Sequence, residues 1–332
     1  MKLAVVFPGQ GSQSVGMLDD WRDRAVVKDT LNEASTTIDV NLDLLIHQGP
    51  VEQLNQTEFT QPAMLAAGIA CWREWQQKSN VTPVWLAGHS LGEYAALVAA
   101  GAIGFVDAIK LVHLRGQLMQ QAAGSDSGAM AAILGLDDTQ VESICKNVSS
   151  AEAPVVAANY NAPGQIVISG AATAVKQCVN EAKTAGAKRA LVLPVSVAAH
   201  SPLMTSAVEP LTSALHKITI TEPTVPVWSF SGMLYASADD IVERLPQQLT
   251  APVKWTNIVD NCVTQGATHL VECGPGKVLM GLNRRIGRQY TDRCFECSAV
   301  FDDKSVRQTI ELMQINKSDN PTDKDNSHAQ CA

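Results

Sequence analysis

Residues 84–97, VWLAGHSLGEYAAL, decide the fold at the centre of the chain. Residues 88–92 match the pattern G-x-S-x-G, after an apolar run that predicts a strand and before an Ala-rich run that predicts a helix. This order is typical of a nucleophile elbow, in which glycines permit a sharp turn and Ser90 stands at a helix N-terminus, where backbone N–H groups face an oxyanion. The alternative is a glycine-rich turn with a capping serine, and the flanking elements favour the elbow.

Strands alternate with helices on both sides of this segment. Such alternation favours an α/β fold with a mostly parallel sheet covered on both faces. Strands are expected at residues 3–7, 84–87, 225–230 and 270–272. Helices are expected at residues 62–75 (opened by Pro62), 91–100, 105–123, 202–216, 239–249, 255–264 and 277–286.

The pattern of strands and helices changes between the helices expected at 105–123 and 202–216. Its elements follow the order β-α-β-β-α-β of a ferredoxin-like unit, with strands at 129–134, 155–159, 165–169 and 190–195 and helices at 137–148 and 171–185. We therefore expect an inserted ferredoxin-like subdomain at 127–194 and a main domain at 1–126 and 195–315. Residues 316–332 are polar without periodicity and are expected to form a disordered tail.

Composition excludes several classes of function. The net charge of −8 argues against nucleic acid as a partner, and no stretch approaches the ~18 consecutive apolar residues of a membrane span. Eight cysteines without regular spacing, behind an N-terminus that does not resemble a signal peptide, indicate reduced thiols and a cytoplasmic protein. No metal or cofactor is expected, because three short motifs are incomplete as nucleotide or zinc sites: Gly9-x-Gly11, Gly276-Lys277-Val278 and Cys294-x-x-Cys297. Reversible redox chemistry at the cysteine pair is a less favoured alternative.

A nucleophilic serine needs a base, and the chain has seven histidines. His200 follows a predicted strand and precedes a helix, which is where α/β folds gather their sites. His89 adjoins the serine, and on an elbow it is expected to point elsewhere. Position alone leaves His200 as one candidate among several.

Arg115 is the more informative charge. It lies three and four residues from apolar neighbours on its predicted helix, with no acidic residue within one turn. A buried guanidinium keeps its proton and demands an anionic partner. The functional interpretation is capture of a substrate carboxylate, and the alternative is an arginine that reaches solvent or pairs with a distant carboxylate.

Seven stretches, in order across residues 3–286, closely resemble the bacterial malonyl-CoA:acyl carrier protein transacylases. They are FPGQGSQ (7–13), AGHSLGEYAAL (87–97), RGQLMQ (115–120), GAMAAILGLDD (128–138), NYNAPGQIVISG (159–170), AGAKRALVLPVSVAAH (185–200) and ECGPGKVLMGLNRRI (272–286). The resemblance implies an α/β-hydrolase-like core with an inserted ferredoxin-like subdomain. It also implies ping-pong transfer of malonyl from malonyl-CoA to the phosphopantetheine thiol of acyl carrier protein, for fatty acid synthesis.

The resemblance further implies residue roles. Ser90 corresponds to the nucleophile, His200 to the general base and Gln248 to the residue whose main-chain carbonyl orients that histidine. Backbone N–H groups of Gln10 and Leu91 correspond to the oxyanion hole. The remaining implied positions are the malonyl-carboxylate clamp Arg115, the pocket residues Gln61, Met119 and Asn159, and the carrier-docking residues Lys188, Arg189, Arg284, Arg285 and Arg288.

Some positions refine or qualify the resemblance. By resemblance to related polyketide acyltransferases, in which a branched apolar residue after the serine goes with malonyl, Leu91 implies malonyl over methylmalonyl. The small Ala199 does not exclude a methyl branch. The family often has VPSH where this chain has VAAH at 197–200, and two asparagines where it has Ser229-Phe230. The second departure puts local hydrogen bonding near the site in doubt, and ordinary solvated side chains remain the alternative for each basic residue.

Two other functions stay open. A serine thioesterase or other hydrolase could use the same elbow, although Arg115 and the ordered motifs favour transfer. A carrier-binding module without catalysis is the second, and the joint presence of Ser90, His200, Gln10 and Arg115 argues against it. A monomer is expected.

Overall fold

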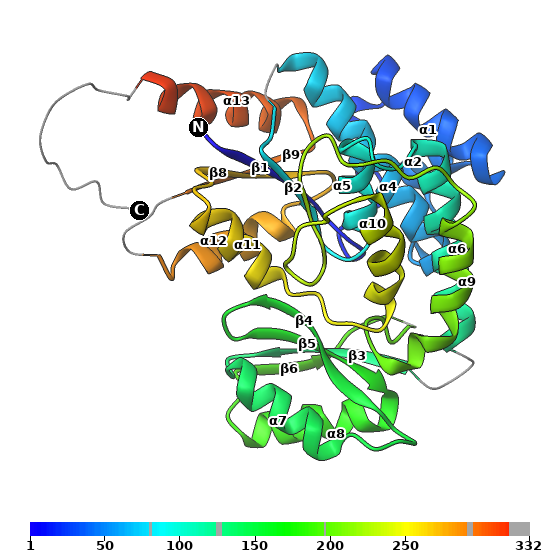
Figure 1. Ribbon diagram of the computed structural model, residues 1–332, viewed down its shortest axis with the longest axis vertical. Helices are drawn as coiled ribbons and strands as arrows, with labels where there is room; N and C mark the ends of the chain where they lie inside the picture. Colours follow the sequence, from blue (N-terminus) through cyan, green and yellow to red (C-terminus); the bar gives the residue numbers. More distant parts are fainter. Residues whose placement is uncertain (80–81, 124–127, 196, 291–294, 319–332) are drawn as a thin grey trace, which may run out of the picture.

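Ser90 stands between a buried strand and a helix in the computed structural model, which describes residues 1–79, 82–123, 128–195, 197–290 and 295–318 (Figure 1). The strands of the main sheet run parallel in the order β7-β2-β1-β8-β9. Their bounds are β1 (Leu3–Phe7), β2 (Trp85–Gly88), β7 (Val227–Trp228), β8 (His269–Cys273) and β9 (Glu296–Val300). The expected α/β fold with a parallel sheet is confirmed.

Helices cover both faces of this sheet, because side chains of successive strand residues point to opposite faces. Leu3, Val5 and Phe7 of β1 enter one hydrophobic cluster, and Ala4 and Val6 enter another. The first cluster is closed by α1 (Ala25–Ile38), α2 (Leu42–Gln48), α3 (Val51–Leu54), α4 (Thr57–Lys78), α5 (Gly92–Ala99), α6 (Phe105–Ala123), α9 (Thr205–Leu215), α10 (Ala238–Arg244) and α13 (Asp303–Ser318). The second is closed by α11 (Trp255–Thr264) and α12 (Val278–Gly287).

A smaller antiparallel sheet has the order β4-β5-β3-β6. Its elements are β3 (Gly128–Leu134), α7 (Asp138–Val148), β4 (Val155–Ala162), β5 (Gln165–Ala171), α8 (Ala172–Thr184) and β6 (Arg189–Val192). Helices α7 and α8 lie on its outer face in Figure 1, and the other face looks toward the main domain. Backbone bonds from Tyr160 N–H to the Val253 carbonyl and from Val253 N–H to the Ala158 carbonyl, both 2.9 Å, attach β4 to the main domain.

Helix α4 begins at Thr57 and not at Pro62, so the expected start was wrong. A proline inside a helix leaves the carbonyl four residues earlier without its usual N–H partner. That carbonyl belongs to Glu58, and it lies 3.0 Å from Nδ1 of His113 on α6, which donates to it. A partner on the neighbouring helix therefore offsets the interruption.

Other boundaries also differ from the expectations. The strand expected at 225–230 is reduced to β7, and the helix expected at 239–249 divides into α10 and a 3-10 helix, Leu245–Leu249. Strand β9, helix α13 and the helices before residue 57 were not predicted. Helix α13 runs through Ser318, so the first residues of the expected tail are helical, and residues 319–332 lie outside the described residues.

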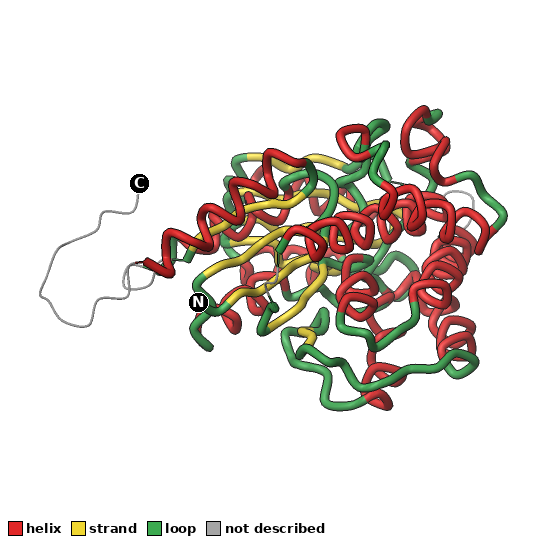
Figure 2. Tube along the Cα trace, turned by 90° about the horizontal axis from the view of Figure 1, so that it is seen from above, coloured by secondary structure: helices red, strands yellow, loops and turns green. Residues whose placement is uncertain are grey.

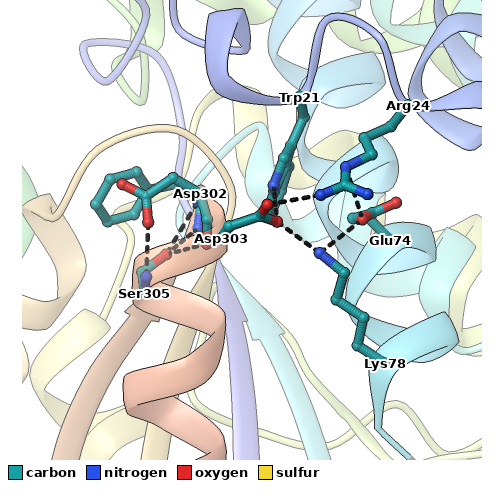
Figure 3. Close-up of polar contacts among 8 residues, drawn as sticks. Trp21, Arg24, Glu74, Lys78, Asp302, Asp303 and Ser305 are labelled. Carbon is teal, nitrogen blue, oxygen red and sulfur yellow. Dashed lines mark hydrogen bonds and ion pairs between the residues drawn. The ribbon is translucent and has the colours of Figure 1, made fainter.

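Helix α13 lies alongside the strands in Figure 2, and a polar cluster fixes its first turn to the N-terminal half (Figure 3). Asp303 accepts hydrogen bonds from Trp21 Nε1 (2.8 Å), Arg24 Nη2 (2.6 Å) and Lys78 Nζ (2.5 Å). Lys78 also pairs with the buried Glu74 at 2.8 Å. These donors hold the pKa of Asp303 well below its ordinary value, with Lys78 the largest cause.

Asp303→Asn is expected to lower the free energy of unfolding at pH 7 by roughly 1 kcal/mol. This corresponds to a fall of about 2 °C in the midpoint temperature of thermal unfolding. A carboxylate whose pKa is depressed on folding stabilises above its ordinary value of 3.8, and that stability is lost as the pH falls below it. Because the folded-state pKa lies well below 3.8, this loss is gradual, and the difference between wild type and variant should shrink in melts near pH 3 without vanishing. Asp302→Asn is the control, because an asparagine in place of Asp302 still caps the Ser305 N–H. Equal melting of wild type and D303N at pH 7 would contradict the role.

Candidate active site

The two glycines of the elbow are required by space. A Cβ on Gly88 would lie 1.9 Å from the Gly92 carbonyl carbon, and a Cβ on Gly92 would lie 2.1 Å from the Phe7 carbonyl oxygen. Ser90 itself has φ +53°, in the left-handed region that non-glycine residues rarely adopt. The turn between β2 and α5 therefore has the sharp geometry that the sequence pattern predicts.

His200 meets Ser90 across the site. Its Nε2 lies 2.8 Å from Ser90 Oγ, and its Nδ1 lies 2.7 Å from the main-chain carbonyl of Gln248. A carbonyl only accepts, so Nδ1 carries the proton and donates it, and Nε2 has a free lone pair to accept from the serine hydroxyl. The backbone of His200 is left-handed (φ +62°), held by its N–H donating to the Leu249 carbonyl at 2.9 Å.

The imidazole is uncharged in this site. Burial, and then the positive charge of Arg115, lower the pKa of His200 to about 3. A neutral imidazole in contact with the hydroxyl is the protonation state that a general base needs.

Arg115 is buried, with 2% of its surface exposed, although it carries a guanidinium. Its Nη1 donates to Gln61 Oε1 (2.7 Å), and its Nη2 donates to Gln248 Oε1 (2.8 Å) and more weakly to Ser90 Oγ (3.4 Å). Within the described residues no carboxylate forms an ion pair with it, and its Nε has no partner. Its partners are therefore neutral, and the cation keeps the capacity to bind an anion.

Close packing of two helices brings Arg115 to this place. A Cβ on Gly116 would lie 2.6 Å from Glu58 Cα, so α6 crosses α4 in near contact. That approach brings Gln61 of α4 within reach of the guanidinium. The ring of Tyr94 on α5 lies 5.5 Å from the guanidinium carbon and adds a cation–π contact.

These groups share one cavity of about 210 Å³ between the two sheets. Its wall includes Ser90, His200 and Arg115 together with Gln10, Leu91, Met119, Asn159, Val197 and Ala199. Gln61 and Gln248 are fully buried and stand behind Arg115, so Gln61, expected as a pocket residue, supports the guanidinium instead. The backbone N–H groups of Gln10 and Leu91 donate to no group of the described chain.

Polar residues at the cavity include one pair that sequence reasoning missed. His89 Nε2 lies 2.8 Å from Asn161 Oδ1, and its ring packs on Trp255 with centroids 5.6 Å apart. His89 is therefore bonded away from the serine, as expected, although it still lines the cavity. Asn159 presents a buried Nδ2 that has no partner in the described chain.

Two basic clusters approach one another beside the small sheet. Lys188 and the side chain of Arg285 flank adjoining turns, which are joined by a 2.8 Å bond from the Gly135 N–H to the Gly164 carbonyl. Arg285 Nε donates to the Pro163 carbonyl at 3.1 Å. Arg189 and Arg288 are exposed, and Arg284 turns toward β9 to donate to the Cys297 carbonyl.

The departure at Ser229-Phe230 leaves a complete hydrogen-bond network. Ser229 Oγ donates to the Met233 carbonyl at 2.8 Å and accepts from Arg244. Phe230 contributes its backbone N–H, which donates to Glu93 Oε2 at 3.1 Å and does not depend on the side chain. Apart from its lone charge in an apolar helix, nothing in the sequence distinguishes Glu93.

Two further observations concern membrane-spanning helices and the cysteines. Across the described ranges, no helix has the length and apolar character to cross a membrane. The six described cysteines are free and buried, while Cys294 of the C-x-x-C pair lies outside the described residues.

Comparison with known proteins gives concordant matches. A family model described as an acyl transferase domain matches residues 4–330. The malonyl CoA-acyl carrier protein transacylase of Escherichia coli K12 is 49% identical over 94% of this chain and 99% of its own length, and that of Bacillus subtilis 168 is 40% identical over 94% and 98%. Among solved structures, an acyl-carrier-protein S-malonyltransferase from Burkholderia pseudomallei superposes with a TM-score of 0.90 at 45% identity, covering 94% and 100% of the two chains. A malonyl-transacylase in complex with a type II polyketide acyl carrier protein superposes with a TM-score of 0.90 at 44% identity, and again 94% of this chain and 100% of that chain are covered.

Proposed function

This chain belongs to the malonyl CoA-acyl carrier protein transacylases, and we propose that it moves malonyl from coenzyme A to acyl carrier protein through an ester on Ser90. The product would be malonyl-acyl carrier protein for fatty acid synthesis. The observation that carries the proposal is the convergence of a serine–histidine pair and a buried, carboxylate-free guanidinium on one cavity. A cation placed 3.4 Å from the nucleophile suits an acyl group that carries its own carboxylate.

The first half-reaction loads the serine. Ser90 Oγ attacks the thioester carbonyl while His200 Nε2 takes its proton, and the oxyanion sits against the free N–H groups of Gln10 and Leu91. Collapse breaks the carbon–sulfur bond, and the departing coenzyme A thiolate takes the proton from His200. One oxyanion donor of this kind contributes roughly 3 kcal/mol in comparable enzymes.

The second half-reaction mirrors the first. The phosphopantetheine thiol of the carrier gives its proton to His200 and attacks the ester carbonyl. Collapse then breaks the bond between the acyl carbon and Ser90 Oγ, which takes the proton back from His200. Malonyl binding would also raise the pKa of His200, because burial and then the charge of Arg115 lower that pKa, and a carboxylate on Arg115 neutralises the charge. The imidazole would become more basic once the correct acyl group is in place.

The partners follow the same reasoning. We assign Lys188, Arg189 and Arg285 to docking of the acidic carrier, with Arg284 and Arg288 beside them, because their positive charge is opposite to that of the carrier. Helix α12, which carries Arg284 and Arg285, also contributes residues to the cavity wall. The chemistry above needs only the malonyl-CoA thioester and the carrier thiol, and no cofactor. We further infer a cytoplasmic monomer, and a preference for malonyl over methylmalonyl set by Leu91, as the resemblance to related acyltransferases implies.

A labelling experiment tests the proposal. Protein mixed with labelled malonyl-CoA should gain one malonyl group on Ser90, which holo acyl carrier protein discharges and water removes slowly. Release of free malonate without carrier would instead identify a hydrolase, and absence of label would identify a binding module. In the same assay, Arg189→Glu should slow discharge by the carrier, and unchanged discharge would remove its docking role.

A further inference from the structure

Glu93 is a carboxyl group inside the molecule that the transfer chemistry does not use. It lies in the first turn of α5, three residues after the nucleophile, and none of its surface is exposed. It accepts hydrogen bonds from Tyr235 Oη (2.5 Å) on Oε1, and from Phe230 N (3.1 Å) and Gln248 Nε2 (2.6 Å) on Oε2. Burial raises its pKa to about 7, so this carboxyl group is costly to keep.

The partner that matters is Gln248, because it connects Glu93 to the reacting groups. The side-chain Nε2 of Gln248 donates to Glu93 and to the Ser90 carbonyl (3.0 Å). Its Oε1 accepts from Arg115 Nη2 at 2.8 Å, and its main-chain carbonyl accepts from His200 Nδ1 at 2.7 Å. One residue therefore holds both the base and the cation.

The orientation of this amide is set by two acceptors, the Ser90 carbonyl and Glu93, and Glu93 makes the shorter contact. An amide has a donor end and an acceptor end that differ little in shape, so its environment selects between them. Oε2 of Glu93 already accepts from the fixed Phe230 N–H and offers a lone pair to Gln248. The NH₂ group of Gln248 must face it, and the amide oxygen is thereby turned to the guanidinium. The inverted amide would set NH₂ against Arg115.

We propose that Glu93 is a positioning residue for malonyl transfer, which fixes the amide of Gln248 so that Arg115 is held in place to bind the substrate carboxylate. The role rests on the proposed function and deepens it. Glu93 acts through the side-chain amide of Gln248 and makes no hydrogen bond to His200, whose Nδ1 is held by the main-chain carbonyl of Gln248.

The test compares two acyl donors in the same variant. Glu93→Leu removes the acceptor, so we expect the ratio of malonyl to acetyl transfer, each measured as kcat/KM, to fall roughly tenfold, since acetyl has no carboxylate to place. Glu93→Gln should keep the ratio, because the Phe230 N–H orients the new amide with its oxygen toward Gln248. Tyr235→Phe is the matched control, since it removes a partner of Oε1 alone.

A purely structural role predicts another result. Loss of folded protein lowers both transfers equally, so an unchanged ratio in Glu93→Leu would overturn the proposal. Should that variant fail to fold, Glu93→Asp keeps the charge but withdraws it from Gln248 by one methylene, and an unchanged ratio there has the same meaning. A ratio that is insensitive to Arg115→Ala as well would instead reject the clamp, which separates failure of the proposed function from failure of the Glu93 role.

Discussion

Replacing His200 by alanine is expected to lower malonyl transfer by about 10³- to 10⁴-fold, without loss of the fold. The reason is geometric: among the described residues, the imidazole of His200 alone contacts Ser90 Oγ as a base. Without it the hydroxyl must lose its proton to water, and both half-reactions slow together. Stopped-flow release of coenzyme A and discharge by holo carrier protein measure the two halves separately.

A control variant and a pH profile complete the test of His200 as the base. His216→Ala removes an exposed histidine at the end of α9 and should behave as wild type. Because the pKa of His200 is about 3, the free enzyme should show no acidic limb from this group between pH 5 and 8. Retention of more than about a tenth of the activity in H200A would reject the assignment of the base.

The parts of the site that were predictable from residues are those set by local sequence. The elbow follows from glycines that flank Ser90 between a strand and a helix, and the β-α-β-β-α-β unit follows from the order of its elements. Arg115 was singled out by a charge on an apolar helix face. In each case a short-range steric or burial constraint determines the structure.

The remaining features depend on contacts between distant segments. His200 could not be chosen among seven histidines, because its meeting with Ser90 joins residues 110 apart in the chain. The start of helix α4 could not be predicted correctly from the sequence. Pro62 leaves the Glu58 carbonyl without its partner within the helix, and the donor that replaces this partner comes from His113 on another helix. Glu93 carried the same signal as Arg115, a lone charge in an apolar helix, yet its purpose is visible only once Gln248 is placed beside it.

Arg115→Ala is expected to lower malonyl transfer by roughly 10²- to 10³-fold and to leave acetyl transfer unharmed or improved. The substrate carboxylate would enter a cavity lined mostly by apolar side chains without a counter-charge, and truncating one partner of a buried charge pair costs 2–5 kcal/mol or more. Acetyl has no such group. It would also meet a better base, because removal of the cation takes away one of the two main causes of the depressed pKa of His200.

The clamp therefore predicts opposite responses from two acyl groups that differ by one carboxylate, whereas general damage to the site would lower both transfers. Arg115→Lys sharpens the test, because lysine keeps the charge but not the planar fork that reaches Gln61 and Gln248 together. We expect it to recover part of the malonyl rate and to suppress the gain with acetyl. Parallel loss of both transfers in Arg115→Ala would mean that the guanidinium supports the fold of the site and does not bind the acyl group. Transfer of malonyl and acetyl from their coenzyme A thioesters, measured as kcat/KM on the same preparations, decides between these outcomes.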